Sequence, residues 1–125
     1  MKKLSLFFLP LIFMIIDSCT PDSLASGGAG VISAPVPPSN LSVTVISSTQ
    51  ANLTWRDNSS NEDGFIIERK MLSNSYVIIA TPTANSTTYS DAGLISHTDY
   101  TYRMTSYNSA GNSGIYTTEV MITTP

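Results

Sequence analysis

Few side chains in this sequence have the chemistry that catalysis needs. His97 is the one histidine and Cys19 the one cysteine, so a Ser/His/Asp or Cys/His device would have to use His97. That residue lies between Ser96 and Thr98, with Asp99 only two residues on, and no nucleophile-elbow sequence accompanies it. The pattern predicts an exposed loop histidine. We therefore expect no catalytic residue and no enzymatic activity.

Oxygen-bearing residues in one polar turn have a spacing that could bind calcium. Four of them fall at offsets 1, 3, 5 and 12 of an EF-hand loop: Asp57, Ser59, Asn61 and Glu68. The glycine that such a loop requires at offset 6 is Glu62 here, and a β-rich segment stands in place of the exit helix. The turn is therefore predicted to be a solvated loop, with no metal site and no cofactor.

The N-terminus has the pattern of a secretory signal peptide. Two lysines precede an apolar run from Leu4 to Ile16, which is shorter than the roughly 20 residues of a transmembrane helix. A positively charged start and a short apolar region are typical of a signal peptide. We assign residues 1–18 to it.

Cys19 follows this apolar run directly, in the sequence Ile16-Asp17-Ser18-Cys19. An aliphatic residue, a small residue and then cysteine resemble the lipobox of bacterial lipoproteins. The resemblance implies cleavage before Cys19, acylation of its sulfur with palmitate among the chains, and attachment to a membrane of the cell envelope. Cleavage further along the chain would instead leave a soluble secreted protein.

The next segment separates the leader from a folded region. Residues 19–37 are rich in Gly, Ser, Ala and Pro without periodicity, which predicts a flexible linker. The whole chain carries a formal net charge of −3. This charge disfavours nucleic acid as a partner, because a phosphate backbone would be repelled.

Residues 38–125 contain short β-rich runs separated by turn signals every 8 to 12 residues, the pattern of an all-β sandwich. Seven strands are predicted, at 40–46, 50–55, 65–69, 76–80, 87–90, 100–107 and 115–123. The sixth run alternates most regularly, with Tyr100, Tyr102 and Met104 on one face, and it ends in the turn Asn108-Ser109-Ala110-Gly111. The domain has no internal cysteine, so its stability must come from its core.

A leucine followed six residues later by a strand-opening tyrosine, Leu94 and Tyr100, resembles the tyrosine corner of Greek-key sandwiches. Trp55 on the second strand, the Glu62-Asp63-Gly64-Phe65 opening of the third and the Asn-Ser-Ala-Gly turn resemble a fibronectin type III domain. Immunoglobulin domains instead carry a cysteine two residues after the corner tyrosine, where this chain has Tyr102. The resemblance implies a seven-stranded antiparallel Greek-key β-sandwich in which Trp55, Leu94 and Tyr100 are structural.

The alternation also predicts which side chains form the core: Leu41, Val43, Leu53, Trp55, Phe65, Ile67, Val77, Ile79, Tyr89, Leu94, Tyr100, Tyr102, Met104, Val120 and Ile122. Tyr76, Tyr107 and Tyr116 remain as tyrosines expected to be exposed, and Tyr107 and Tyr116 are the candidates for contact with a ligand. The expected function is a non-catalytic protein- or carbohydrate-binding module, surface-anchored or secreted. The alternative is a structural spacer, or a fragment of a larger enzyme or adhesin, with no ligand of its own.

Overall fold

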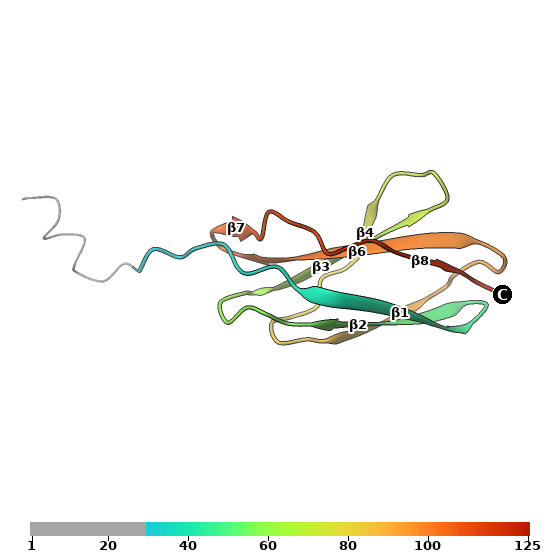
Figure 1. The fold of residues 1–125 in the computed structure, drawn as a ribbon, viewed down its shortest axis with the longest axis horizontal. Helices are drawn as coiled ribbons and strands as arrows, with labels where there is room; N and C mark the ends of the chain where they lie inside the picture. Colours follow the sequence, from blue (N-terminus) through green and yellow to red (C-terminus); the bar gives the residue numbers. More distant parts are fainter. Residues whose placement is uncertain (1–29) are drawn as a thin grey trace, which may run out of the picture. The chain divides into compact units, whose positions relative to one another are not determined.

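The computed structural model describes residues 30–125, and all regular elements in this range are β-strands. They are β1 (Ser39–Ser47), β2 (Gln50–Arg56), β3 (Gly64–Met71), β4 (Val77–Ala80), β5 (Thr88–Ala92), β6 (Asp99–Asn108), β7 (Gly111–Asn112) and β8 (Val120–Thr123). The strands form two packed layers (Figure 1). The predicted signal peptide and Cys19 lie outside the described residues.

Both layers are antiparallel sheets. One has the strand order β1-β2-β5, and the other has the order β4-β3-β6-β7 with β8 also paired to β6. The chain crosses between the sheets after β2, β4 and β5, which is Greek-key connectivity. The predicted all-β Greek-key sandwich is therefore confirmed. The additional strand is β7, a two-residue pairing that continues the predicted turn after β6.

Side-chain alternation along the strands builds the core. In β2, Ala51, Leu53 and Trp55 are buried while the residues between them are exposed. In β6, which belongs to the other sheet, Tyr102 and Met104 are fully buried. The full buried cluster is Ala51, Leu53, Trp55, Phe65, Ile67, Leu94, Tyr100, Tyr102, Met104 and Ile122.

Six residues of the predicted core are less than fully buried: Leu41, Val43, Ile79 and Tyr89 are partly buried against the core cluster, and Val77 and Val120 lie outside it. Val77 is 55% exposed, so its assignment to the core is wrong. It belongs to β4, the edge strand of the five-stranded sheet, and the opposite sheet has only three strands to cover it. Val120 is partly buried. The period-2 pattern identifies the face of a strand and does not show how far the opposing sheet extends.

The predicted strand 115–123 is shorter in the structure, where β8 begins at Val120. The preceding part still approaches β6, since the Thr117 N–H donates to the Met104 carbonyl at 2.9 Å. In return, the Met104 N–H donates to the Thr117 side-chain oxygen at 3.1 Å. A side chain thus replaces a backbone acceptor, and the regular ladder is interrupted at this position.

Residues 33–37, which the sequence pattern places in the linker, make hydrogen bonds to the sandwich. Asn61 and Asn108 each donate a side-chain N–H to the Ser33 carbonyl, at 3.0 and 2.8 Å. Ser106 donates its hydroxyl to the Val36 carbonyl at 2.8 Å, and Pro35 is buried. The compact unit accordingly begins at Ile32.

Candidate functional site

The corner between β5 and β6 is fixed by the tyrosine that opens β6. Leu94 is 4% and Tyr100 2% exposed, and the Ile95 N–H donates to the Tyr100 hydroxyl oxygen at 2.9 Å. This bond closes the loop over five residues in the geometry of a tyrosine corner. His97 is exposed in the same loop, and its backbone N–H donates to the Thr124 carbonyl at 3.1 Å.

A buried polar cluster that the sequence did not indicate joins the two sheets. Asp91 of β5 is 3% exposed; it accepts two hydrogen bonds from Arg69 Nη1, at 2.7 and 2.9 Å, and one from the Tyr102 hydroxyl at 2.8 Å. Burial and the nearby Asp91 carboxylate raise the pKa of the Tyr102 phenol, so it stays protonated and donates. The three residues satisfy one another inside the fold, which indicates a structural role.

Tyr107, one of the two predicted ligand contacts, packs against the start of β3. It lies opposite Gly64, and a Cβ added there would come within 3.1 Å of the tyrosine hydroxyl and 2.5 Å of the Pro82 carbonyl oxygen. The ring is partly buried. Tyr107 therefore covers a glycine gap in the sheet and has part of its surface committed to packing.

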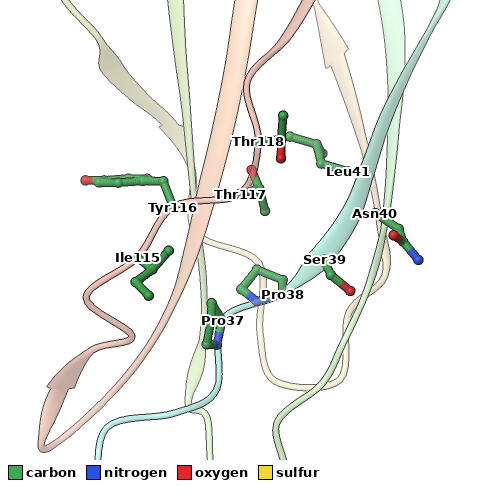
Figure 2. A pocket seen from close by; sticks show the side chains of 9 residues that line it. All are labelled: Pro37, Pro38, Ser39, Asn40, Leu41, Ile115, Tyr116, Thr117 and Thr118. Atoms are coloured by element: carbon green, nitrogen blue, oxygen red, sulfur yellow. The ribbon is translucent and has the colours of Figure 1, made fainter.

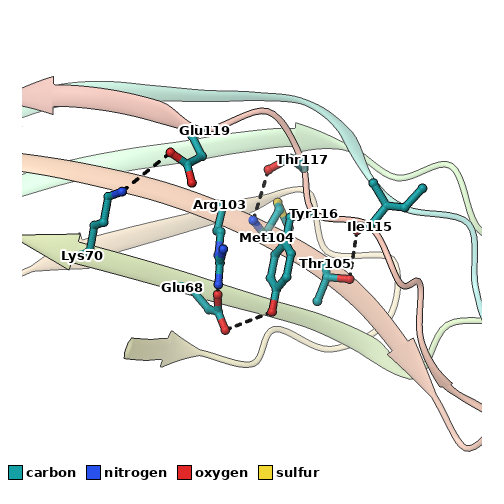
Figure 3. A network of polar contacts seen from close by, with 9 residues as sticks. All are labelled: Glu68, Lys70, Arg103, Met104, Thr105, Ile115, Tyr116, Thr117 and Glu119. Atoms are coloured by element: carbon teal, nitrogen blue, oxygen red, sulfur yellow. Dashed lines mark hydrogen bonds and ion pairs between the residues drawn. The ribbon is translucent and has the colours of Figure 1, made fainter. Parts of the chain in front are cut away.

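Tyr116, the second predicted contact, lies in the segment between β7 and β8 and is 40% exposed. The Arg103 guanidinium lies 3.9 Å from its ring centroid, and its hydroxyl donates to Glu68 at 3.3 Å (Figure 3). Arg103 is also 3.8 Å from the ring centroid of Tyr76. One guanidinium thus lies close to two tyrosine rings, a cation–π arrangement that fixes their positions.

Two ion pairs lie beside these rings on the outer face of the sheet. Arg103 Nε pairs with Glu68 at 2.6 Å, and Lys70 with Glu119 at 3.8 Å (Figure 3). We call the set Glu68, Lys70, Tyr76, Arg103, Tyr116 and Glu119 the tyrosine surface. Burial, with Glu119 nearby, raises the pKa of Tyr76 to about 12. The phenol therefore remains neutral at physiological pH.

A groove of about 360 Å³ lies on the other side of the segment that carries Tyr116. It is lined by residues 37–41 and 115–118. Figure 2 shows the Tyr116 ring directed away from Pro37, Pro38 and Leu41. The groove and the tyrosine surface consequently share Tyr116, whose ring points away from the opposite wall of the groove.

The structure does not bring Tyr107 and Tyr116 together. Tyr107 pairs with Gly64, whereas Arg103, which holds Tyr116, pairs with Glu68. Arg103 and Tyr107 are four residues apart on β6, which corresponds to about 13 Å. The sequence could have indicated the Glu68–Arg103 pair only if the register of β3 against β6 had been known, because both residues face outward from directly opposed positions.

Within residues 30–125, no group of three or more His, Cys, Asp and Glu side chains is placed to hold a metal ion. In the same range, no helix is long and apolar enough to cross a membrane. The tyrosine surface consists of two anchored aromatic rings with charged hydrogen-bonding groups beside them.

The two-sheet Greek-key topology, the tryptophan on β2 and the tyrosine corner define an immunoglobulin-like sandwich without its cysteine pair. The family profile described as "Fibronectin type III domain" matches residues 36–123. The chain therefore belongs to the fibronectin type III family, as the sequence resemblance predicted. Domains of this family are in general non-catalytic modules.

A curated protein named alpha-amylase, from Niallia circulans, is 33% identical over 92 residues; these cover 74% of this chain and only 7% of that protein. Among solved structures, a Fn3-like protein from Clostridium thermocellum is 29% identical with a TM-score of 0.61, covering 74% of this chain and 96% of the other. The FN1–FN3 domains of chicken CNTN1 are 22% identical with a TM-score of 0.65, covering 74% and 33%. That last likeness concerns the fold alone.

Proposed function

We propose that this protein is a non-catalytic binding module of a bacterial cell envelope, which contacts an extracellular polysaccharide or protein through the tyrosine surface. The observation that carries the proposal is the position of Tyr116, which is 40% exposed and is held by Arg103 and Glu68. A ring fixed in this way can stack on a ligand without losing further rotamer freedom on binding. Its relation to one segment of a protein named alpha-amylase favours polysaccharide over protein.

Charged groups beside the rings would supply hydrogen bonds to a ligand. Lys70 and Glu119 are 28% and 50% exposed at their side chains and are joined by a contact of 3.8 Å. A pair this loose contributes little to stability, so its atoms can be redirected toward hydroxyl groups of a glycan. Tyr107, about 13 Å along the strand, would contact a second residue of an extended ligand.

Replacing Tyr116 by Ala is expected to weaken binding of the compact unit 32–125 to its polysaccharide by about 5-fold, since one aromatic contact contributes roughly 1 kcal/mol. Isothermal titration against a panel of soluble polysaccharides and matrix proteins would measure this. Met121→Ala is the control, because Met121 is 71% exposed on β8 and is not part of the tyrosine surface. Equal binding by the Tyr116 and Met121 variants would overturn the assignment of the binding face.

For localisation we propose that acylated Cys19 anchors the protein in a bacterial membrane, as the lipobox resemblance implies. The expected result is that the protein enters the detergent phase in a Triton X-114 extraction and that Cys19→Ser moves it to the aqueous phase. Stable anchoring needs more than one acyl chain. If the wild-type protein stays in the aqueous phase, the secreted form is correct and the anchor is not.

The second candidate function is a spacer or a part of a larger protein, without a ligand of its own. It is favoured by the 7% share of the alpha-amylase that this chain matches. Saturable binding that Tyr116→Ala reduces supports the module. No binding by the wild-type unit to any member of the panel supports the spacer.

A further inference from the structure

The free edge of β4 lacks the charged side chains that usually protect an exposed strand. β4 is the end strand of the five-stranded sheet, and among the described residues it pairs on one side, with β3. Natural edge strands commonly carry charges that disfavour pairing with another chain. Residues 71–90 contain no charged side chain. Within them, residues 75–81 (SYVIIAT) have the uncharged, β-branched composition of a segment that pairs readily.

Both faces of β4 expose a branched apolar side chain at this edge. Ile78 lies opposite Glu68, on the outer face of the sheet, and is 61% exposed. Val77 lies opposite Arg69, which reaches the other sheet, so Val77 belongs to the inner face. There Val77 and the exposed Ile95 line a cavity of about 270 Å³. Apolar surface is therefore available to a partner on both faces of one strand.

The other free edges of the described sandwich differ from that of β4. β1 packs against β8, and its pairing with β2 contains two register shifts, which are irregularities of the kind that protect edges. β5 exposes the polar Thr88 and Ser90. β7 has two residues, and β8 directly follows the charged Glu119. Pairing with another apolar strand is therefore favoured most at β4.

We propose that β4 pairs antiparallel with β4 of a second copy of this chain, about a two-fold axis. Such an interface brings the same surface of both copies together, so a charge on the strand would face its own copy and be repelled. The uncharged β4 meets this condition. The chain has a net charge of −3, which disfavours contact between copies through their charged surfaces. A charged peptide, by contrast, would find no opposite charge along residues 71–90.

The alternation of β4 determines the register of this pairing. Opposed residues of an antiparallel pair point to the same face of the sheet. With Ile78 opposite its own copy, Val77 lies opposite Ile79 on the inner face, beside the cavity. The pairing of β4 with β3 shifts register between Ile67 and Glu68, so the regular part of the strand is short. Interfaces below about 1,200 Å² form weak, reversible complexes, and we expect a Kd of about 100 µM.

The dimer would carry its two tyrosine surfaces on the same side. The two-fold axis of an antiparallel strand pair is perpendicular to the sheet, so the outer faces of both copies stay on one side of it. Tyr76 directly precedes β4, and the two tyrosine surfaces therefore flank the axis. A polymer with repeated units would contact both and bind more tightly than to one copy. This consequence rests on the function proposed above, whereas the pairing of β4 does not.

Sedimentation equilibrium of the purified protein, without any ligand, tests the pairing. Between about 10 µM and 1 mM, the weight-average mass is expected to rise from near that of one chain toward that of two. Over the same range, amide hydrogen exchange of residues 77–80 is expected to slow, while exchange of residues 39–47 in β1 stays unchanged. A mass that remains that of one chain at about 1 mM, or slowing confined to β1, would overturn the proposal.

Substitutions of exposed isoleucines locate the interface. Ile78→Lys is expected to raise the Kd of the dimer by about 10-fold or more, because two lysines would then face each other. Ile78→Thr keeps a branched side chain suited to a strand and is expected to raise the Kd by about 3-fold. Ile46→Lys is the matched control, because Ile46 is an exposed isoleucine on β1, an edge strand of the other sheet, and it should leave the Kd unchanged. Each variant should melt as cooperatively as the wild-type protein. Association that persists unchanged in Ile78→Lys, or that Ile46→Lys weakens equally, would refute the assignment to β4.

Discussion

Replacing Asp91 by Ala is expected to lower the free energy of unfolding by about 3–5 kcal/mol, the usual cost of removing one partner from a buried ion pair. The carboxylate accepts hydrogen bonds from Arg69 and from the fully buried Tyr102. Without it, a guanidinium and a phenol are left inside the fold with no acceptor. The Arg69 side chain is 23% exposed, so water reaching it places the loss near the lower end of this range. Urea denaturation would measure the change.

Two variants separate the charge from the packing in this experiment. Asp99→Ala removes an exposed carboxylate at the start of β6, which accepts a hydrogen bond from the Thr123 hydroxyl at 2.6 Å. This change is expected to lower the free energy of unfolding by less than about 1 kcal/mol. Adding Arg69→Met to Asp91→Ala should restore part of the loss, because no unpaired charge then remains. A cost for Asp91→Ala as small as that of Asp99→Ala would contradict the structural role of the cluster.

This cluster also shows where prediction from the sequence ends. The alternation of β2 and β6, the tyrosine corner and the turn after β6 each depend on residues close together in the chain, and the sequence predicted them. Asp91, Arg69 and Tyr102 come from three strands in two sheets, and their contact depends on register and on how the sheets are superposed. Period-2 patterning fixes which face a residue occupies and says nothing about its partner across the core.

The same reason explains the other differences. Ser33 and Val36 lie in a segment of linker composition, and their carbonyls accept hydrogen bonds from Asn61, Asn108 and Ser106, which are distant in sequence. Thr117 replaces a backbone acceptor for Met104 and so interrupts a strand that looks continuous in the sequence. For the candidate site, Tyr116 was expected to be exposed because Tyr89, Tyr100 and Tyr102 were assigned to the core; alternation along 115–123 would instead place it on the same face as Val120 and Ile122. Its fixation by Arg103 was not predictable, because that contact joins β6 to a segment without regular structure.

Trp55→Ala is expected to have an effect of similar size for a different reason. The indole is 5% exposed and meets the Phe65 ring edge-on, with centroids 5.6 Å apart and planes at 63°. Its truncation would leave a large cavity between the sheets, and such a change costs about 3–5 kcal/mol. A domain of this size has a total stability of roughly 5–15 kcal/mol, so a substantial fraction of the variant is expected to be unfolded at 37 °C.

The cost of Trp55→Ala comes from lost packing and not from a lost hydrogen bond, and a second variant tests this. Trp55 Nε1 is buried without a partner among the described residues, so Trp55→Phe removes an unsatisfied donor along with part of the ring. We expect it to cost about 1–2 kcal/mol, well below Trp55→Ala, because an aromatic ring still meets Phe65. Ile46→Ala on β1, where the side chain is 51% exposed, serves as the surface control. If Trp55→Ala melts cooperatively within about 1 kcal/mol of the wild-type protein, the tryptophan is not the centre of this core, and the packing of the two sheets must rest on Phe65 and the residues of β6.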